Sequence, residues 1–241
     1  MKHFRNGFLF IMCFLLLISS SGAAEISIAD FAQSELDSFG KQVGFLLSRR
    51  QYKGAAPLGL IGFNIGVEAT AVKLEDTSLW NKSYSTSSAP SYLFFPVAHI
   101  KKGLPLSVDI GLRGGAAPNA DLSLMGGEIS YAPLAGSIVT PAVNLFLAYS
   151  VLNGGKNFDL NSTSFGASIS KGIGILTPYA GISYDQTKLS VQGSSLPLQN
   201  TTNSGIRQFV GAKLNMLIFS LCVEADFGEM QSYGLSLDIG I

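Results

Sequence analysis

The chain has 241 residues, of which 47% are apolar and only 13% are charged; the charged share is about half that of an ordinary soluble domain. So apolar a composition excludes an intrinsically disordered chain. The balance of 16 basic against 16 acidic side chains argues against a nucleic-acid-binding protein. The apolar side chains must therefore be buried in a core or face lipid.

The first residues have the pattern of a secretory signal peptide. Lys2 and Arg5 precede an apolar run over 7–18, and small residues then lead to Ala24. The run has about 12 residues, fewer than the roughly 20 that a transmembrane helix needs. We therefore expect residues 1–24 to be cleaved after Ala24, and the rest of the chain to be exported through the inner membrane.

Cleavage would leave one cysteine, Cys222, and one histidine, His99. An intramolecular disulfide is then impossible, and the clusters that usually bind zinc are absent from the sequence. We expect neither a metal nor any other cofactor.

Residues 28–47 have apolar side chains at steps of three and four, which is typical of an amphipathic helix. Arg49 and Arg50 follow, where cations suit the C-terminus of a helix. We treat 25–54 as this helix and its linker. Three positions remain open for the helix: at the periplasmic mouth of the domain that follows, inside that domain as a plug, or on the membrane surface.

From residue 58 onward, apolar residues alternate with small or polar ones at the period of a β-strand. In 106–113, for example, aliphatic residues occupy the even positions and Ser107, Asp109, Gly111 and Arg113 the odd positions. The pattern predicts ten strands, over 58–73, 92–101, 105–114, 122–132, 141–152, 158–170, 177–187, 205–216, 218–227 and 232–241.

Two architectures can use such strands. A soluble sandwich buries the apolar faces in one core, whereas a membrane barrel turns them to lipid and keeps its polar face inside. The segments are close to the 9–11 residues of a membrane-spanning strand, glycines recur on the polar face, and the chain ends on a strand. The sequence therefore predicts an all-β fold over 55–241, a closed antiparallel transmembrane barrel of about 10 strands, within 8–12. The alternative is a periplasmic sandwich that binds an apolar ligand.

The connections between strands indicate an orientation. An even number of strands places both ends of a barrel on the periplasmic side, so odd strands lead to outer loops, which are usually longer. The two longest predicted loops, 74–91 and 188–204, both follow odd strands, and short links at 102–103 and 171–174 follow even strands. We expect the two long loops to face the exterior and to meet any surface partner.

The last predicted strand resembles the C-terminal targeting signal of outer-membrane barrels, in which a polar residue, a glycine and alternating apolar residues follow one another. The matching residues are Ser232, Gly234, Leu237, Ile239 and Ile241, the last in place of the usual phenylalanine. The blocks 57–66, 102–105, 170–172 and 177–181 are similar to an uncharacterised, porin-like family of proteobacterial outer-membrane proteins. This resemblance covers most of 40–241. It implies a cell outer-membrane location, contact with outer-membrane lipid and insertion by the barrel-assembly machinery, and it supplies no catalytic residues.

Cleavage of the signal peptide would leave His99 as the only histidine, the residue type that most often acts as a general base. We expect it to be structural and the protein not to be an enzyme; an outer-membrane hydrolase that uses His99 is the less favoured alternative.

Charged residues on the polar face are predicted to line the lumen, with seven acids against two bases: Glu68, Asp109, Arg113, Glu128, Asp185, Lys213, Glu224, Asp226 and Asp238. They either form ion pairs that close a narrow barrel or line a small pore that prefers cations. We expect a monomeric structural or surface protein, or a narrow channel for small solutes or cations.

Overall fold

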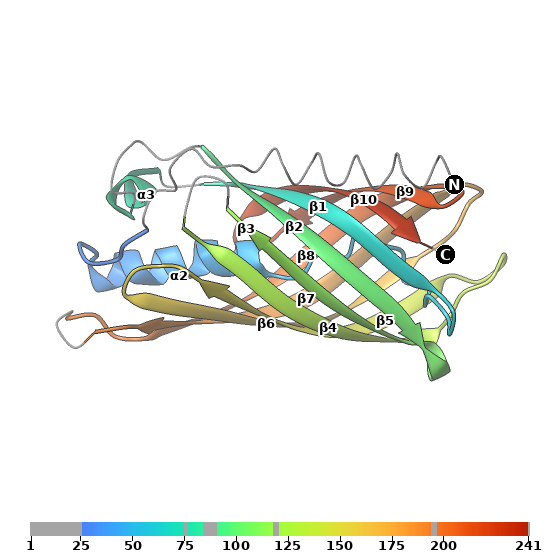
Figure 1. The fold of residues 1–241 in the computed structure, drawn as a ribbon, viewed down its shortest axis with the longest axis horizontal. Helices are drawn as coiled ribbons and strands as arrows, with labels where there is room; N and C mark the ends of the chain where they lie inside the picture. Colours follow the sequence, from blue (N-terminus) through green and yellow to red (C-terminus); the bar gives the residue numbers. More distant parts are fainter. Residues whose placement is uncertain (1–25, 75–76, 84–90, 118–120, 194–196, 241) are drawn as a thin grey trace.

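The computed structural model describes residues 26–74, 77–83, 91–117, 121–193 and 197–240; the predicted signal peptide with its cleavage at Ala24, as well as Ile241, lies outside them. Ten antiparallel strands form a closed barrel in chain order, and β1 pairs with β10 to close it (Figure 1). The predicted fold is therefore confirmed, and the β-sandwich is wrong. The strands are β1 (Phe63–Lys73), β2 (Tyr92–Leu104), β3 (Val108–Ala116), β4 (Ser123–Leu134), β5 (Ala142–Asn153), β6 (Phe158–Ser170), β7 (Leu176–Val191), β8 (Thr201–Met216), β9 (Phe219–Phe227) and β10 (Gln231–Gly240).

Some predicted boundaries are wrong. The first strand begins at Phe63 and not at 58, because Gly59 has a φ of +77° and the Gly62 N–H donates to its carbonyl in a turn. The connection predicted over 188–204 is only 192–200, because β7 and β8 continue as a ladder of polar residues whose backbone groups pair up to Leu189 and Thr201. The loop predicted over 74–91 contains a short helix, α3 (Thr77–Ser83), and a 3-10 turn, η1 (Pro105–Ser107), joins β2 to β3.

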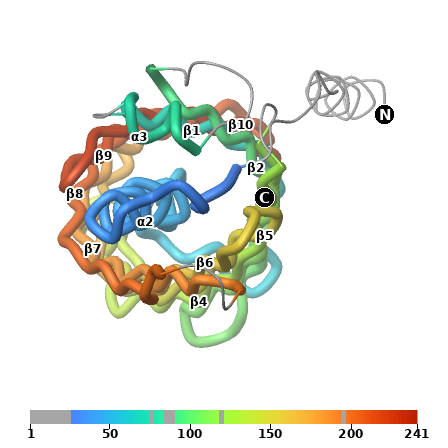
Figure 2. Tube along the Cα trace, turned by 90° about the vertical axis from the view of Figure 1, so that its left-hand side faces the viewer, coloured from blue at the N-terminus to red at the C-terminus, as the bar shows by residue number. Residues whose placement is uncertain are grey.

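The N-terminal helix, α2 (Gln33–Leu47), lies inside the barrel, where the strands surround it (Figure 2). It begins later than the predicted residue 28: Ala32 caps it, and the Ala32 N–H donates to Glu35 Oε2 at 2.8 Å. α2 packs against β6, β7 and β8. None of the helices in the described residues has the length and apolar content of a membrane span.

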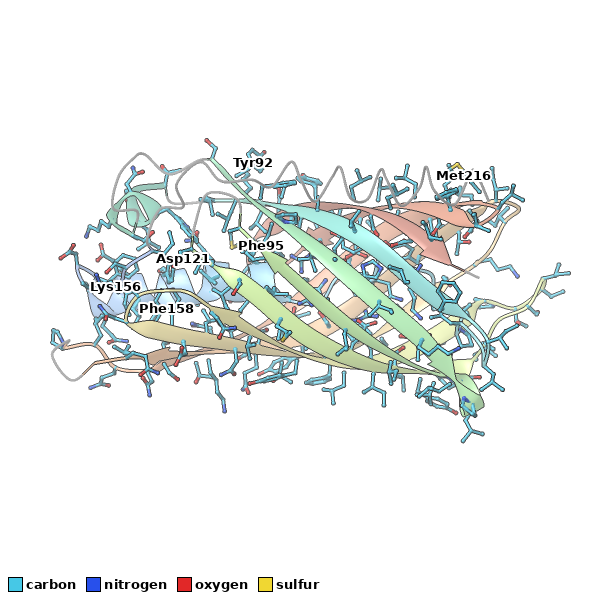
Figure 3. All side chains as sticks on the ribbon, viewed as in Figure 1. Tyr92, Phe95, Asp121, Lys156, Phe158 and Met216 are labelled. Carbon is cyan, nitrogen blue, oxygen red and sulfur yellow. The ribbon has the colours of Figure 1, made fainter. Side chains whose placement is uncertain are left out.

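The two faces of the barrel wall differ in composition. Large apolar side chains point outward and are exposed; examples are Ile100, Leu147 and Phe165, which are half-exposed. In Figure 3, Tyr92, Asp121 and Lys156 mark one end of the barrel and Met216 marks the other. The inner face carries buried polar and charged groups together with glycines.

Inward glycines make room for aromatic rings inside this narrow barrel. A Cβ atom on Gly181 would overlap the ring of Phe209, and one on Gly211 would overlap the ring of Tyr179. The same holds in α2, where a Cβ on Gly44 would overlap the side chain of Thr187 on β7. The helix can therefore approach the wall closely only because Gly44 has no side chain.

We predict that Gly44→Val lowers the free energy of unfolding by about 1–3 kcal/mol, the usual cost of overpacking a filled interior. Ser34→Val is the matched control, because Ser34 is an exposed residue of the same helix. Urea unfolding of both variants in detergent micelles measures the difference. Equal stability of the two variants would show that α2 does not pack against the wall at Gly44.

Candidate functional site

The lumen is the candidate site, because the N-terminal segment runs through it. We call residues 26–58 the plug. After α2, its backbone is held by the wall at successive depths: Gln51 and Tyr52 donate to Glu224 of β9 at 3.1–3.2 Å, and the Ala55 N–H donates to Ser170 Oγ at 2.7 Å. The plug therefore extends from one end of the barrel towards the other.

The half of the lumen that contains α2 is filled by an apolar layer. The ring of Phe39 lies 5.0 Å from that of Trp80 in α3 and 5.5 Å from that of Phe158 in β6. Trp80 is fully buried, and its Nε1 donates to Gln42 Oε1 at 2.7 Å. Burial of large aromatic side chains is strongly stabilising, so this layer anchors the helix at this end of the barrel.

The other half is filled by an ionic layer. All three cations of the plug that follow α2 are buried and paired with acids of the wall. Arg49 pairs with Glu128, Lys53 pairs with Asp109, and Arg50 Nε lies 3.1 Å from Asp226 Oδ2. A buried charge is tolerated only with such a partner, so the plug and the wall depend on each other.

Two further cations of the wall extend the network. Arg207 of β8 pairs with Asp185 at 2.9 Å and also with Asp226, and one of its amino groups donates to the carbonyl of Arg49. Lys101 of β2 lies 3.1 Å from Glu128.

The structure places all nine predicted lining residues on the inner face. Lys213 is half-buried opposite Cys222 in the β8–β9 register. The predicted ratio of seven acids to two bases is wrong, because Lys101 and Arg207 also face inward. With His99 counted as neutral, seven acids against four bases leave three negative charges on the described wall. Arg49, Arg50 and Lys53 of the plug supply three positive charges.

Comparison with protein families gives a match over residues 120–241 to a family of unknown function, DUF6588. The chain belongs to this family. The matched region begins just before β4 and contains all the strands from there to β10. No curated protein matches the sequence.

Several solved structures are similar to the chain. The N-terminal β-barrel domain of OprF from Pseudomonas aeruginosa is 14% identical, with a TM-score of 0.35, and the match covers 74% of this chain and 97% of that one. OprG from the same organism is 9% identical, with a TM-score of 0.37 and coverage of 78% and 99%. The translocator domain of the autotransporter NalP from Neisseria meningitidis is 10% identical, with a TM-score of 0.34 and coverage of 86% and 94%.

His99 lies on the inner face of β2. Its Nε2 is 2.9 Å from Asn64 Oδ1 and 3.1 Å from Asp238 Oδ1, and its Nδ1 is 3.7 Å from Glu68. These partners are acids and an amide, and none is a hydroxyl or thiol nucleophile. Within the described ranges, no three His, Cys, Asp or Glu residues are placed so that they could hold a metal ion.

Sequence reasoning missed five charged members of the site. Arg207 is at an odd-numbered position of β8, as Lys213 is, and Lys101 is at an odd-numbered position of β2, as His99 is. Strict alternation was therefore sufficient to place Arg207 and Lys101 on the inner face. Arg49, Arg50 and Lys53 carry no comparable signal, because they lie outside any periodic element.

We predict that Asp226→Asn lowers the free energy of unfolding by about 3–5 kcal/mol, because it leaves Arg50 and Arg207 short of a buried counter-charge. Asp30→Asn, at an exposed position of the plug, is the control and is expected to change stability by less than about 0.5 kcal/mol. Equilibrium unfolding in detergent measures both. A loss no larger than that of the control would show that the plug is not held by this network.

Proposed function

We propose that the protein is an outer-membrane β-barrel that its own N-terminal segment closes, with a structural or surface role and no enzymatic activity. Displacement of the plug would turn the lumen into a narrow channel that prefers cations. The observation that carries this proposal is the charge balance of the lumen, in which three buried cations of the plug neutralise the excess acids of the wall.

The outer face supports a membrane location. Large apolar side chains cover it around the barrel, as is typical of a wall that faces hydrocarbon. On β6 and β7 this cover ends beyond Phe165 and Tyr184, where the next outward residues, among them Asp159 and Lys188, are polar. The polar ends of these strands then lie outside the bilayer.

The connections support an orientation. At one end the strands are joined by links such as η1 and the turn at Leu217, and at the other by α3 and the connection over 192–200. Short turns are typical of the periplasmic end of such barrels and long loops of the outer end. We therefore place α3 outside the cell, and we place both chain termini of the barrel domain on the periplasmic side. β10, which carries Ser232, Gly234, Leu237 and Ile239 of the proposed targeting residues, would be the strand that the assembly machinery reads.

We predict that residues 25–241 inserted into a planar bilayer give no current steps, because the plug fills the lumen. A chain that begins at residue 55 is expected to give steps and to prefer K⁺ over Cl⁻, since the wall then carries uncompensated acids. Single-channel recording with a salt gradient measures both properties.

Charge variants of the wall provide the control for selectivity. In the shortened chain, the double change Asp109→Asn and Asp226→Asn is expected to reduce the cation preference without closing the pore. Steps from the intact chain that equal those of the shortened chain would contradict a closed barrel. Failure of both chains to insert, with both staying soluble without detergent, would contradict the membrane location.

A further inference from the structure

The plug enters the lumen at the end that carries the long connections. The Ser27 N–H donates to the carbonyl of Ser83 in α3 at 3.0 Å, and the Lys156 N–H, between β5 and β6, donates to the carbonyl of Ile26 at 2.8 Å. The Gln199 N–H, between β7 and β8, donates to Gln33 Oε1 at 2.9 Å. Three separate outer connections therefore hold the beginning of the plug, and Figure 1 shows α2 and α3 at the same end of the barrel.

The plug leaves the lumen at the opposite end. The Leu58 N–H donates to Asp109 Oδ1 at 3.0 Å, near the start of β3. The carbonyl of Leu60 accepts from Lys102 Nζ at 2.7 Å, and the Gly103 N–H donates to the carbonyl of Gly62 at 3.0 Å, at the end of β2. From there the chain reverses into β1. The plug therefore crosses the whole barrel, against the direction of β1.

We infer that the N-terminal end of the plug is displayed on the outside of the cell, and that the barrel carries its own N-terminal segment across the outer membrane. The inference rests on the orientation in the proposed function. An exported chain reaches this membrane from the periplasm, yet residues 26–32 lie among the outer connections, so the segment must pass to the exterior while the barrel is assembled.

The packing indicates when this passage takes place. α2 fits the wall so closely that a Cβ on Gly44 would overlap the side chain of Thr187, and one on Gly40 would lie 2.9 Å from Asn203 Nδ2. Sliding the helix through a finished barrel would disrupt both the apolar and the ionic layers. Closure of β1 on β10 around a segment that is already in the lumen avoids this cost. The lumen is then the route by which the segment reaches the surface.

The displayed part has its own accessible face. Ala29, Asp30, Gln33 and Ser34 are exposed at the outer mouth, while Ile26 and Ile28 next to them are fully buried. The buried residues fix the segment in the mouth, and the exposed ones form part of the surface that the outer loops present.

Single cysteines test this inference in whole cells. Asp30→Cys and Ser34→Cys probe the start of the plug, and Leu60→Cys probes its exit, where Leu60 is 64% exposed. Asp121→Cys marks the outer end and Leu217→Cys the inner end. The native Cys222 is fully buried, so the unchanged chain gives the background for a membrane-impermeant maleimide.

We expect intact cells to label Asp30→Cys, Ser34→Cys and Asp121→Cys at least about tenfold more than Leu60→Cys and Leu217→Cys. The last two should be labelled only after the outer membrane is permeabilised. Two positions of the plug, Asp30 and Ser34, are probed so that the test does not depend on a single variant, which could fail to assemble.

The outcomes separate the two proposals. Labelling of Asp121→Cys but of neither plug probe would overturn surface display and leave the outer-membrane barrel intact. Labelling of Leu217→Cys but not of Asp121→Cys in intact cells would overturn the orientation, and surface display with it. Labelling of no variant until the cells are lysed would overturn the outer-membrane location itself.

Discussion

The structure depends on the pairing of buried charges inside a barrel that its own N-terminal segment fills. A wall with seven acids and four bases is unfavourable by itself, because an unpaired buried charge is costly. The plug supplies the missing cations at Arg49, Arg50 and Lys53, each against a different acid. The ionic half of the lumen is therefore complete only when the N-terminal segment is in place.

The apolar half of the lumen is stabilised by the packing of side chains and not by ion pairs. Phe39, Trp80 and Phe158 pack as they would in the core of a soluble protein, although the barrel as a whole has its apolar side chains on the outside. The protein thus has two apolar regions of opposite orientation, an outer cover and an inner core at one mouth. The plug completes the second, because its Phe39 packs against both Trp80 and Phe158.

The barrel was predictable because strict alternation, as in 106–113, reports which face of a strand each residue occupies. The helix over 33–47 was predictable from its periodicity, but its place was not, since its apolar face suits a membrane, a mouth or a lumen equally well. Arg49, Arg50 and Lys53 could not be assigned, because their partners, such as Glu128 and Asp109, are far away in sequence. The paired ends of β7 and β8 were predicted to be a loop because their side chains are polar. A hydropathy pattern reports the burial of side chains, and these two strands pair through backbone hydrogen bonds that do not require burial.

The short turn at Gly59, which joins the plug to β1, has a thermodynamic consequence. A plug that detaches cannot diffuse away, because only the few residues between Leu58 and Phe63 separate its last contact from the closing strand. Its return is an intramolecular reaction, and short tethers correspond to effective concentrations in the millimolar range. Opening of the lumen would then be brief and reversible unless a ligand captured the released segment. The duration of the open state would depend on the strength of the ion pairs and not on the concentration of the protein.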